Sequence, residues 1–249
     1  MLRLDFRGHG ASGRASGEYS PDGYVSDAVA AIEQVAGQPC VVMGHSLGGA
    51  TAAALSQRHP DLLVAAVMED PPLGVAGSSA AAATGDVPAL AGDNSLLESF
   101  RVIRETAPQM QASGMTPDAL AAVLAMAPTS TGASFADTVH PDALAAMAGS
   151  LLTVDASVLD PVLTGSIGSF LDPDGPFLVP SLIVCADPAK PDAVADPILA
   201  QHFAAISPAT EFIVLEGAGH LIHDEQASRE AFREVAIGFI DRVSASGSD

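Results

Sequence analysis

Short apolar runs closed by turn residues alternate along much of this chain with segments whose apolar positions recur every three to four residues. The apolar runs predict strands at residues 2–6, 39–43, 62–68, 181–185 and 211–215. The segments between them predict helices near residues 21–35, 49–58, 198–206 and 226–243. Because parallel strands need crossover connections, this order predicts an α/β fold with a mostly parallel sheet and flanking helices.

The alternation stops between residues 73 and 178. That stretch has no convincing strand pattern, and its helical patterns lie near residues 95–111, 116–127, 140–152 and 156–170. Two of these patterns open with Thr-Pro-Asp or His-Pro-Asp, which is typical of the first turn of a helix. We therefore predict a core formed by residues 1–72 and 179–249, interrupted by a helical insertion at residues 73–178.

Composition narrows the classes of partner. The 249 residues include 30 acidic and only 10 basic side chains, for a net charge of −20, and Lys190 is the only lysine. Nucleic acids and anionic membrane surfaces are therefore disfavoured as partners. No apolar run approaches the length of a membrane span, and the N-terminus lacks the pattern of a secretory signal. We expect a cytoplasmic protein acting on a small-molecule substrate, whose oligomeric state its sequence leaves open.

The cysteines and the glycine-rich motifs indicate no cofactor. Cys40 and Cys185 lie in apolar runs without metal-type spacing, so we expect reduced core residues. Residues 8–13 match the dinucleotide fingerprint G-x-G-x-x-G, but no helix begins directly after them. Residues 44–51 imitate a phosphate-binding loop, yet Ala50 stands where that loop needs lysine. We expect neither a nucleotide cofactor nor a bound metal.

Residues 44–48, Gly-His-Ser-Leu-Gly, fit the nucleophile elbow G-x-S-x-G. The motif follows a predicted strand and precedes a predicted helix, which is the context that the elbow requires. Glycines flank the serine because side chains there would collide with the neighbouring backbone. Ser46 is therefore the candidate nucleophile, and the Leu47 N–H is the candidate oxyanion donor.

A serine nucleophile needs a base, and the elbow predicts the chain order serine, acid, histidine. His220 follows the predicted strand at 211–215 in a glycine-rich loop, so it is the candidate base, with His223 as the alternative. The remaining histidines lie on predicted helices or in tight turns: His9, His45, His59, His140 and His202.

Three aspartates compete for the acid. Asp187 follows the strand at 181–185 and is the first choice. Asp192 lies in the same loop, and Asp70 follows the strand at 62–68. Each could instead start a turn or cap a helix, and the motif order requires only that the acid precede the histidine.

The chain resembles the α/β-hydrolase family, of the serine-esterase and haloperoxidase-like type. Asp5-Phe6-Arg7-Gly8-His9-Gly10-Ala11-Ser12 matches the family loop D-x-R-G-H-G-x-S, Gly44–Gly49 its elbow, 60–71 its following strand, and Gly217–His220 its histidine loop. The resemblance implies a lid of helices over the active site, which is the interpretation we give residues 73–178. It leaves the acid open, because Ala186 and Ala189 stand where the family usually carries a glycine and the acid.

The resemblance also implies that the first three strands of the family precede residue 1, together with the loop that donates the second oxyanion N–H. Either residues 2–6 pair directly with the strand at 39–43, or Met1 is an internal start; we favour the second. We expect a hydrolase that cleaves a small uncharged or hydrophobic ester, thioester or lactone through an acyl-enzyme. The alternative is a non-catalytic or truncated binding protein with the same fold.

Overall fold

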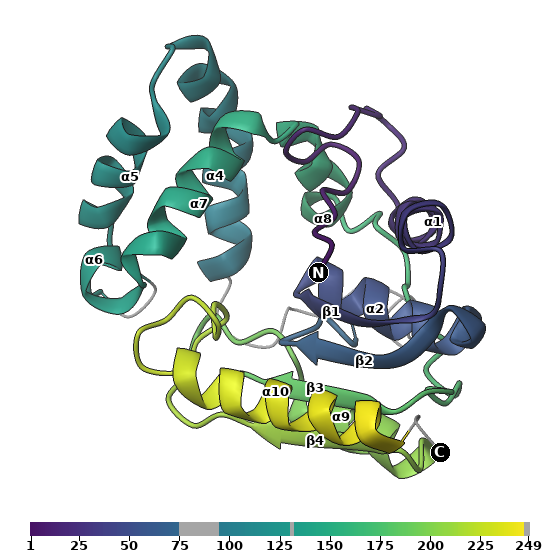
Figure 1. Ribbon diagram of the computed structural model, residues 1–249. Coiled ribbons are helices and arrows are strands. Elements are labelled where there is room, and N and C mark those ends of the chain that lie inside the picture. Colours follow the sequence, from purple (N-terminus) through teal and green to yellow (C-terminus); the bar gives the residue numbers. More distant parts are fainter. Residues whose placement is uncertain (75–94, 130–131, 247–249) are drawn as a thin grey trace.

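The computed structural model describes residues 1–74, 95–129 and 132–246. Its sheet has four parallel strands in the order β1 (Cys40–His45), β2 (Leu63–Glu69), β3 (Ser181–Cys185) and β4 (Thr210–Val214). Each strand lies within two residues of its predicted position, so the predicted parallel α/β sheet is confirmed. All four carboxyl ends point to the same edge, beside which the helical insertion lies (Figure 1).

Alternating side chains of the strands bury the two faces of the sheet. Ala66 and Met68 of β2 face one core cluster, whereas Ala65 and Val67 face another. The first cluster includes side chains from α1 (Pro21–Ala31), α2 (Leu47–Arg58) and α9 (Pro197–Ile206). The second is covered by α10 (Arg229–Ser246), which crosses the front of the sheet in Figure 1. The central strands β2 and β3 are thus largely buried on both faces, as the strands of parallel sheets usually are, whereas β1 and β4 are partly exposed.

Local sequence signals decide where the helices begin and end. Ser20 caps α1 through its hydroxyl, which accepts the Gly23 N–H, and a proline occupies the first turn. The π-helical segment η1 (Ile32–Ala36) continues α1 and ends at Gly37, which has a left-handed φ of 66°. The 3-10 segment η2 (Pro60–Leu62) separates α2 from β2.

The first predicted strand is wrong. Leu2–Phe6 forms no strand and does not pair with β1, which within the described residues pairs only with β2. Instead, the Asp5 carboxylate accepts the Ala11 N–H, and the Asp5 carbonyl accepts the Ser12 hydroxyl. These bonds close residues 5–12 into a compact loop.

Between β2 and β3 the described chain is helical, as predicted. The elements are α4 (Ser95–Ala112), α5 (Pro117–Met126), α6 (Phe135–Thr138), α7 (Pro141–Thr153), η3 (Ala156–Leu159) and α8 (Asp160–Leu163). The predicted helix at 156–170 is too long, because Gly165 adopts a φ of 69° directly after α8. Residues 75–94 and 130–131 of the predicted 73–178 segment lie outside the described residues.

Hydrogen bonds fasten the helical insertion to the core at both ends of α7, and also at Gln57 and Arg58 of α2. At one end of α7, the His140 N–H donates to the Asp224 carbonyl at 2.7 Å, and the Gln226 N–H donates to the Thr138 carbonyl at 2.8 Å. These bonds join the turn before α7 to the loop that carries His220. The position of that histidine loop is therefore tied directly to the insertion.

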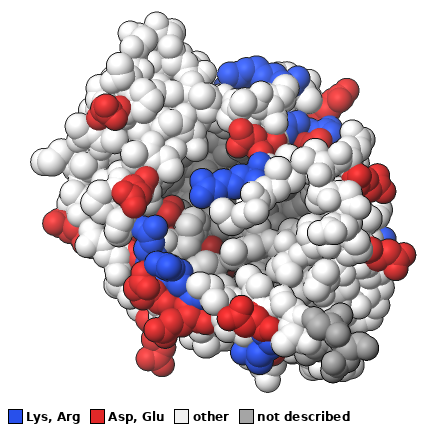
Figure 2. Space-filling model, viewed as in Figure 1, with Lys and Arg blue, Asp and Glu red and all other residues white. Residues whose placement is uncertain are grey.

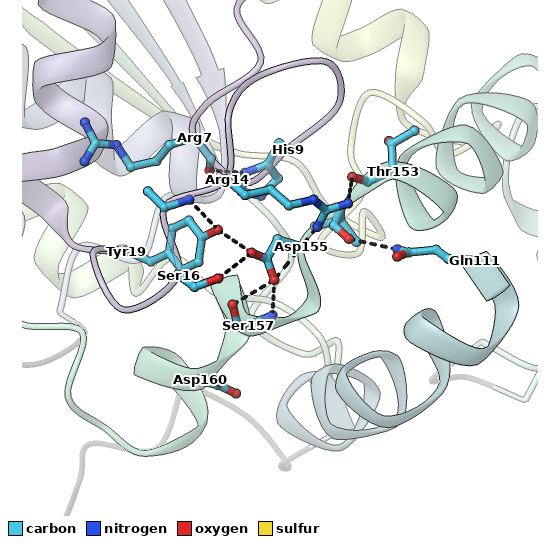
Figure 3. Close-up of polar contacts among 12 residues, drawn as sticks. Arg7, His9, Arg14, Ser16, Tyr19, Gln111, Thr153, Asp155, Ser157 and Asp160 are labelled. Carbon is cyan, nitrogen blue, oxygen red and sulfur yellow. Dashed lines mark hydrogen bonds and ion pairs between the residues drawn. The ribbon is translucent and has the colours of Figure 1, made fainter.

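The second attachment centres on Asp155, between α7 and η3 (Figure 3). Its carboxylate accepts the hydroxyls of Tyr19, Ser16 and Ser157, and its backbone N–H donates to the Gly8 carbonyl at 2.7 Å. Figure 3 shows these groups converging on one carboxylate from the N-terminal loop and the insertion. We call this group of contacts the Asp155 junction.

Among the described helices, none is alone long and apolar enough to cross a membrane. Only α7 and residues 156–163 taken together have that length and apolar composition, and the two are bent by 100° relative to each other.

Cys40 and Cys185 are both free thiols, and burial raises the pKa of Cys185 to about 12. The thiol of Cys185 is therefore protonated at neutral pH.

Candidate functional site

Ser46 occupies a strained turn between β1 and α2. Its φ of 51° and ψ of −115° are rare for a residue with a side chain, and such a conformation costs about 1–3 kcal/mol. The Ser46 N–H donates to the Glu69 carbonyl at 2.8 Å, which ties the turn to the end of β2. A Cβ added to Gly44 would lie 2.2 Å from the Gly48 carbonyl carbon, so the close backbone approach requires glycine.

Ser46 precedes α2 without using its hydroxyl to cap that helix. The Leu47 N–H lies in the first turn, where backbone amides have no partner within the helix. The positive end of the helix dipole therefore lies beside the serine. This arrangement is suited to a negative charge that develops on an atom bound to Ser46.

Asp70 is the carboxylate that contacts His220. Its Oδ2 lies 2.7 Å from His220 Nδ1, and both side chains are buried. The same carboxylate accepts the N–H groups of Ala186, Val194 and Ala195, each at 3.0 Å. Because an ionised carboxylate only accepts hydrogen bonds, Nδ1 carries a proton, and in the neutral ring Nε2 has the lone pair. His220 can therefore act as a base at Nε2.

Asp187, the first choice from the sequence, does not contact His220. It is half-exposed, and its carboxylate accepts the N–H of Ala189 in its own turn and the N–H of Gly217 in the histidine loop. These two bonds, in that order, lower its pKa. Asp192 also lacks a bond to His220, and its Oδ1 is buried without a hydrogen-bond partner. Of the three sequence candidates, the structure brings Asp70 alone to the histidine.

A second histidine–carboxylate pair lies beside the first. Glu69 is 2% exposed, and its Oε1 accepts both the backbone N–H of His223 and a hydrogen bond from His223 Nδ1, each at 2.8 Å. Burial opposes a charge on this ring, but the hydrogen bond and negative charge of Glu69 outweigh it and raise the pKa of His223. Glu69 was not among the residues predicted from the sequence, although its position beside Asp70 at the end of a strand was the available signal.

His45 lies between these two pairs. Its ring centroid is 4.5 Å from that of His220 and 5.2 Å from that of His223. Its Nε2 lies 2.8 Å from the His220 carbonyl oxygen, to which it donates. Burial, followed by repulsion from the other two histidines, holds the pKa of His45 well below its usual value. His45 is therefore neutral. Because His45 directly precedes Ser46, its hydrogen bond holds the His220 backbone beside the serine.

A cavity of about 220 Å³ opens at Ser46. Its walls are mostly apolar: His9, Tyr24, Ser46, Leu47, Pro72, Leu96, Phe100, Val158, Leu159, Val162, Ile167, Phe170 and Val194. The insertion supplies Leu96 and Phe100 from α4 and Val162 from α8, so its helices form part of the wall. The surface is visibly hollowed between the insertion and the core (Figure 2). A larger open groove of about 450 Å³ lies at the far end of α2, around Gln57 and Arg58, and contains none of the candidate residues.

The remaining histidines differ in their surroundings. His140 caps α7, and His202 on α9 lies 3.0 Å from the Pro173 carbonyl through its Nε2. His9, by contrast, lines the cavity at Ser46, which its place in a tight turn did not indicate. Within the described ranges, no group of three or more His, Cys, Asp or Glu side chains is arranged to hold a metal ion.

A parallel α/β sheet with a strained serine after one strand and a buried histidine–carboxylate pair at the same edge is the arrangement of an alpha/beta hydrolase. The sequence profile of the Alpha/beta hydrolase family matches residues 1–234. The chain belongs to this family, which confirms the fold expected from its motifs.

Solved structures share the fold over most of the chain. The E-2-(acetamidomethylene)succinate hydrolase is 19% identical with a TM-score of 0.64, and the match covers 95% of this chain and 80% of that one. The enol-lactonase from Burkholderia xenovorans LB400 is 21% identical with a TM-score of 0.63, over 95% of this chain and 79% of that one.

Two sequence relatives match over shorter stretches. The alpha/beta hydrolase domain-containing protein WAV2 of Arabidopsis thaliana is 38% identical over 76 residues, which are 28% of this chain and 24% of that protein. Lipase LipV of Mycobacterium tuberculosis (strain ATCC 25618 / H37Rv) is 39% identical over 74 residues, which are 30% of this chain and 28% of that protein. The match thus spans about a quarter of the length of each relative.

Proposed function

We propose that this protein is a serine hydrolase in which Ser46, His220 and Asp70 form the catalytic triad. The observation that carries the proposal is the buried 2.7 Å bond between Asp70 and His220, at the strand edge where Ser46 adopts its strained turn. Asp70 replaces Asp187 as the acid. His45, which directly precedes Ser46, also bonds the His220 backbone, so the two halves of the site are in contact.

Each residue has a defined part in the reaction. His220 Nε2 removes the proton from the Ser46 hydroxyl as Oγ attacks the substrate carbonyl. Asp70 holds the Nδ1 proton and stabilises the imidazolium that forms. The imidazolium then donates its Nε2 proton to the leaving alcohol, thiol or lactone oxygen. In the second half, His220 removes a proton from the water that attacks the acyl-enzyme. The imidazolium of His220 then donates this proton to Ser46 Oγ as the bond to the acyl group breaks and the acid leaves.

The tetrahedral intermediates carry a negative charge on the former carbonyl oxygen. The Leu47 N–H and the first turn of α2 stabilise that charge. A further donor from the protein would be worth about 100- to 1,000-fold in rate, so the strength of catalysis depends on whether the site offers one.

The substrate is a small uncharged or hydrophobic ester, thioester or lactone. A cavity of about 220 Å³ lies below the usual range for drug-sized ligands, and its walls are apolar. The net charge of −20 disfavours anionic substrates through the long-range field. An enol-lactonase and a lipase among the similar proteins are consistent with such a carbonyl substrate. The insertion acts as the lid, since its helices supply walls of the cavity.

Labelling with a fluorophosphonate probe tests this function, because such probes modify an activated serine. The folded wild-type protein should gain one adduct, which peptide mass spectrometry should place on Ser46, and Ser46→Ala should gain none. Ser166→Ala, an exposed serine of the insertion, serves as the matched control and should label like wild type. A folded wild-type protein without an adduct on Ser46 would overturn the proposal and favour a non-catalytic binding protein.

A further inference from the structure

Glu69, which is buried, and His223, whose side chain is 41% exposed, form a second pair with no part in the triad. The Glu69 side chain is almost completely buried and lies one residue before Asp70. Two carboxylates this close would both be costly to bury if neither charge were compensated. Three backbone N–H groups and His220 compensate the Asp70 carboxylate, whereas the Glu69 carboxylate accepts two hydrogen bonds from His223.

The geometry of His223 indicates the charge on its ring. Nδ1 lies 2.8 Å from Glu69 Oε1, and Nε2 lies 3.3 Å from Asp224 Oδ1. Ionised carboxylates only accept hydrogen bonds, so a lone pair on either ring nitrogen would face a negative oxygen. Both nitrogens face carboxylates favourably only when both carry protons, which makes the ring an imidazolium.

Charged and titratable groups face this ring from every element around it. Glu69 lies at the end of β2, the neutral His45 at the end of β1, and Arg229 at the start of α10, from where its charge opposes that of His223. Asp224 and His220 belong to the same loop as His223. The aromatic ring of Phe232 on α10 lies 6.3 Å from the His223 ring and carries no charge.

Resting on the proposed function, we propose that Glu69 and His223 are positioning residues that form a charge-balanced ion pair behind the catalytic base. The imidazolium of His223 cancels the Glu69 carboxylate, so that His220 responds to Asp70 alone. The same pair fixes the loop, since Glu69 also accepts the backbone N–H of His223, three residues after the base. When His220 takes the proton from Ser46, each of the two carboxylates at the end of β2 then faces one imidazolium.

Replacing either member of the pair should shift the titration midpoint of His220, in opposite directions for the two residues. His223→Gln leaves the Glu69 charge uncancelled, which favours a proton on His220 and moves its titration midpoint up by about 0.5–1 pH unit. Glu69→Gln leaves the imidazolium uncancelled and moves the midpoint down by a similar amount. The double variant removes both charges and should return the midpoint close to that of wild type. A purely structural role would give no such opposed shifts.

The experiment is a pH titration of the histidine rings by ¹⁵N-resolved NMR, in wild type, in both single variants and in the double variant. At about pH 7 the wild-type ring of His223 should carry protons on both nitrogens. His202→Gln, on α9, is the matched control and should leave the His220 midpoint unchanged. The acid limb of kcat/KM should shift in the same directions as the NMR midpoints.

A singly protonated His223 in wild type at pH 7 would overturn the inference, and so would single variants whose shifts are absent or of the same sign. The wild-type measurement requires no variant to fold. The titration also requires no turnover, so it is independent of the labelling of Ser46. Loss of the opposed shifts in a protein that labels at Ser46 would remove this inference and leave the hydrolase proposal standing.

Discussion

Asp70 Oδ2 lies 2.7 Å from His220 Nδ1, although 150 residues separate the two along the chain. The contact is possible because β2 and the histidine loop end at the same edge of a parallel sheet. Asp70 has a left-handed φ of 39°, and three backbone N–H groups hold its carboxylate. The backbone therefore fixes the Asp70 carboxylate independently of its contact with His220. This pre-organised position suits the proposed role of Asp70 as the triad acid.

Replacing Asp70 should therefore impair catalysis far more than replacing Asp187. Asp70→Asn should lower kcat/KM for a p-nitrophenyl ester by about 10⁴-fold, because an amide no longer fixes the proton on Nδ1. Asp187→Asn should stay close to wild type, since Asp187 does not contact His220 and an asparagine Oδ1 can still accept one of its two hydrogen bonds, from Ala189 or from Gly217. Thermal melts should accompany the assay to show that both variants are folded. Full activity in Asp70→Asn would refute the assignment of the acid.

The elbow should tolerate a methyl group at Gly48 but not at Gly44. A Cβ at Gly44 would lie 2.2 Å from the backbone carbon of Gly48, so Gly44→Ala should lose at least about 1–3 kcal/mol in free energy of unfolding. A Cβ at Gly48 meets no atom within 4 Å, so Gly48→Ala should be neutral or gain up to about 1 kcal/mol. Urea denaturation measures both. Equal stabilities for the two variants would contradict the close approach seen here.

The Asp155 junction should contribute more to stability than a surface ion pair of the same insertion. Asp155→Asn should cost about 1–3 kcal/mol, because the mostly buried carboxylate accepts several hydroxyl and N–H donors. Asp160→Asn breaks the half-exposed ion pair with Arg104 and should cost about 1 kcal/mol or less. Chemical denaturation measures the free energy of unfolding of both variants. A larger loss in Asp160→Asn than in Asp155→Asn would contradict the prediction.

The stability that Asp155 contributes should depend on pH with a defined sign. Burial opposes ionisation, but hydrogen bonds from Tyr19, Ser157 and Ser16 outweigh it and lower the pKa of Asp155. Because the pKa of Asp155 is lower in the folded protein, its stabilisation is complete above the pKa in the unfolded chain, about 3.9. The stabilisation is lost as the pH falls toward the pKa in the folded protein. The difference in unfolding free energy between wild type and Asp155→Asn should therefore be constant near pH 6–7 and shrink below about pH 4. A difference that grows in acid would be the wrong sign.

The cavity wall should set the size of the acyl group. Val162 lines the cavity from α8, so Val162→Trp should fill space and raise KM for a hexanoate ester by more than it does for an acetate ester. Val123→Trp on α5, where the side chain is 59% exposed and outside the cavity wall, is the matched control. Steady-state kinetics with both esters measure the ratio. An unchanged hexanoate-to-acetate ratio in Val162→Trp would show that the acyl group binds elsewhere.

Local patterns in the sequence determined most elements of this protein. The four strands and most of the helices follow from apolar periodicity, although α6 was not predicted. The strand–serine–helix order identified the elbow; the expected collision with the backbone is present at Gly44 but not at Gly48, where a Cβ would meet open space. The predicted strand at 2–6 is an exception, because an apolar run forms a strand only where a neighbouring edge accepts its hydrogen bonds. Here the Asp5 side chain and carbonyl bond within the loop instead.

The tertiary structure decided which carboxylate meets which histidine. Asp70, Asp187 and Asp192 all stand in loops after strands, and their spacing along the chain does not distinguish them. Only the folded sheet brings Asp70 to His220 and Glu69 to His223, because these contacts depend on the direction of each side chain at the carboxyl edge. Local propensity acts within a few residues, whereas the burial and pairing of charges depend on groups that only the completed fold brings together.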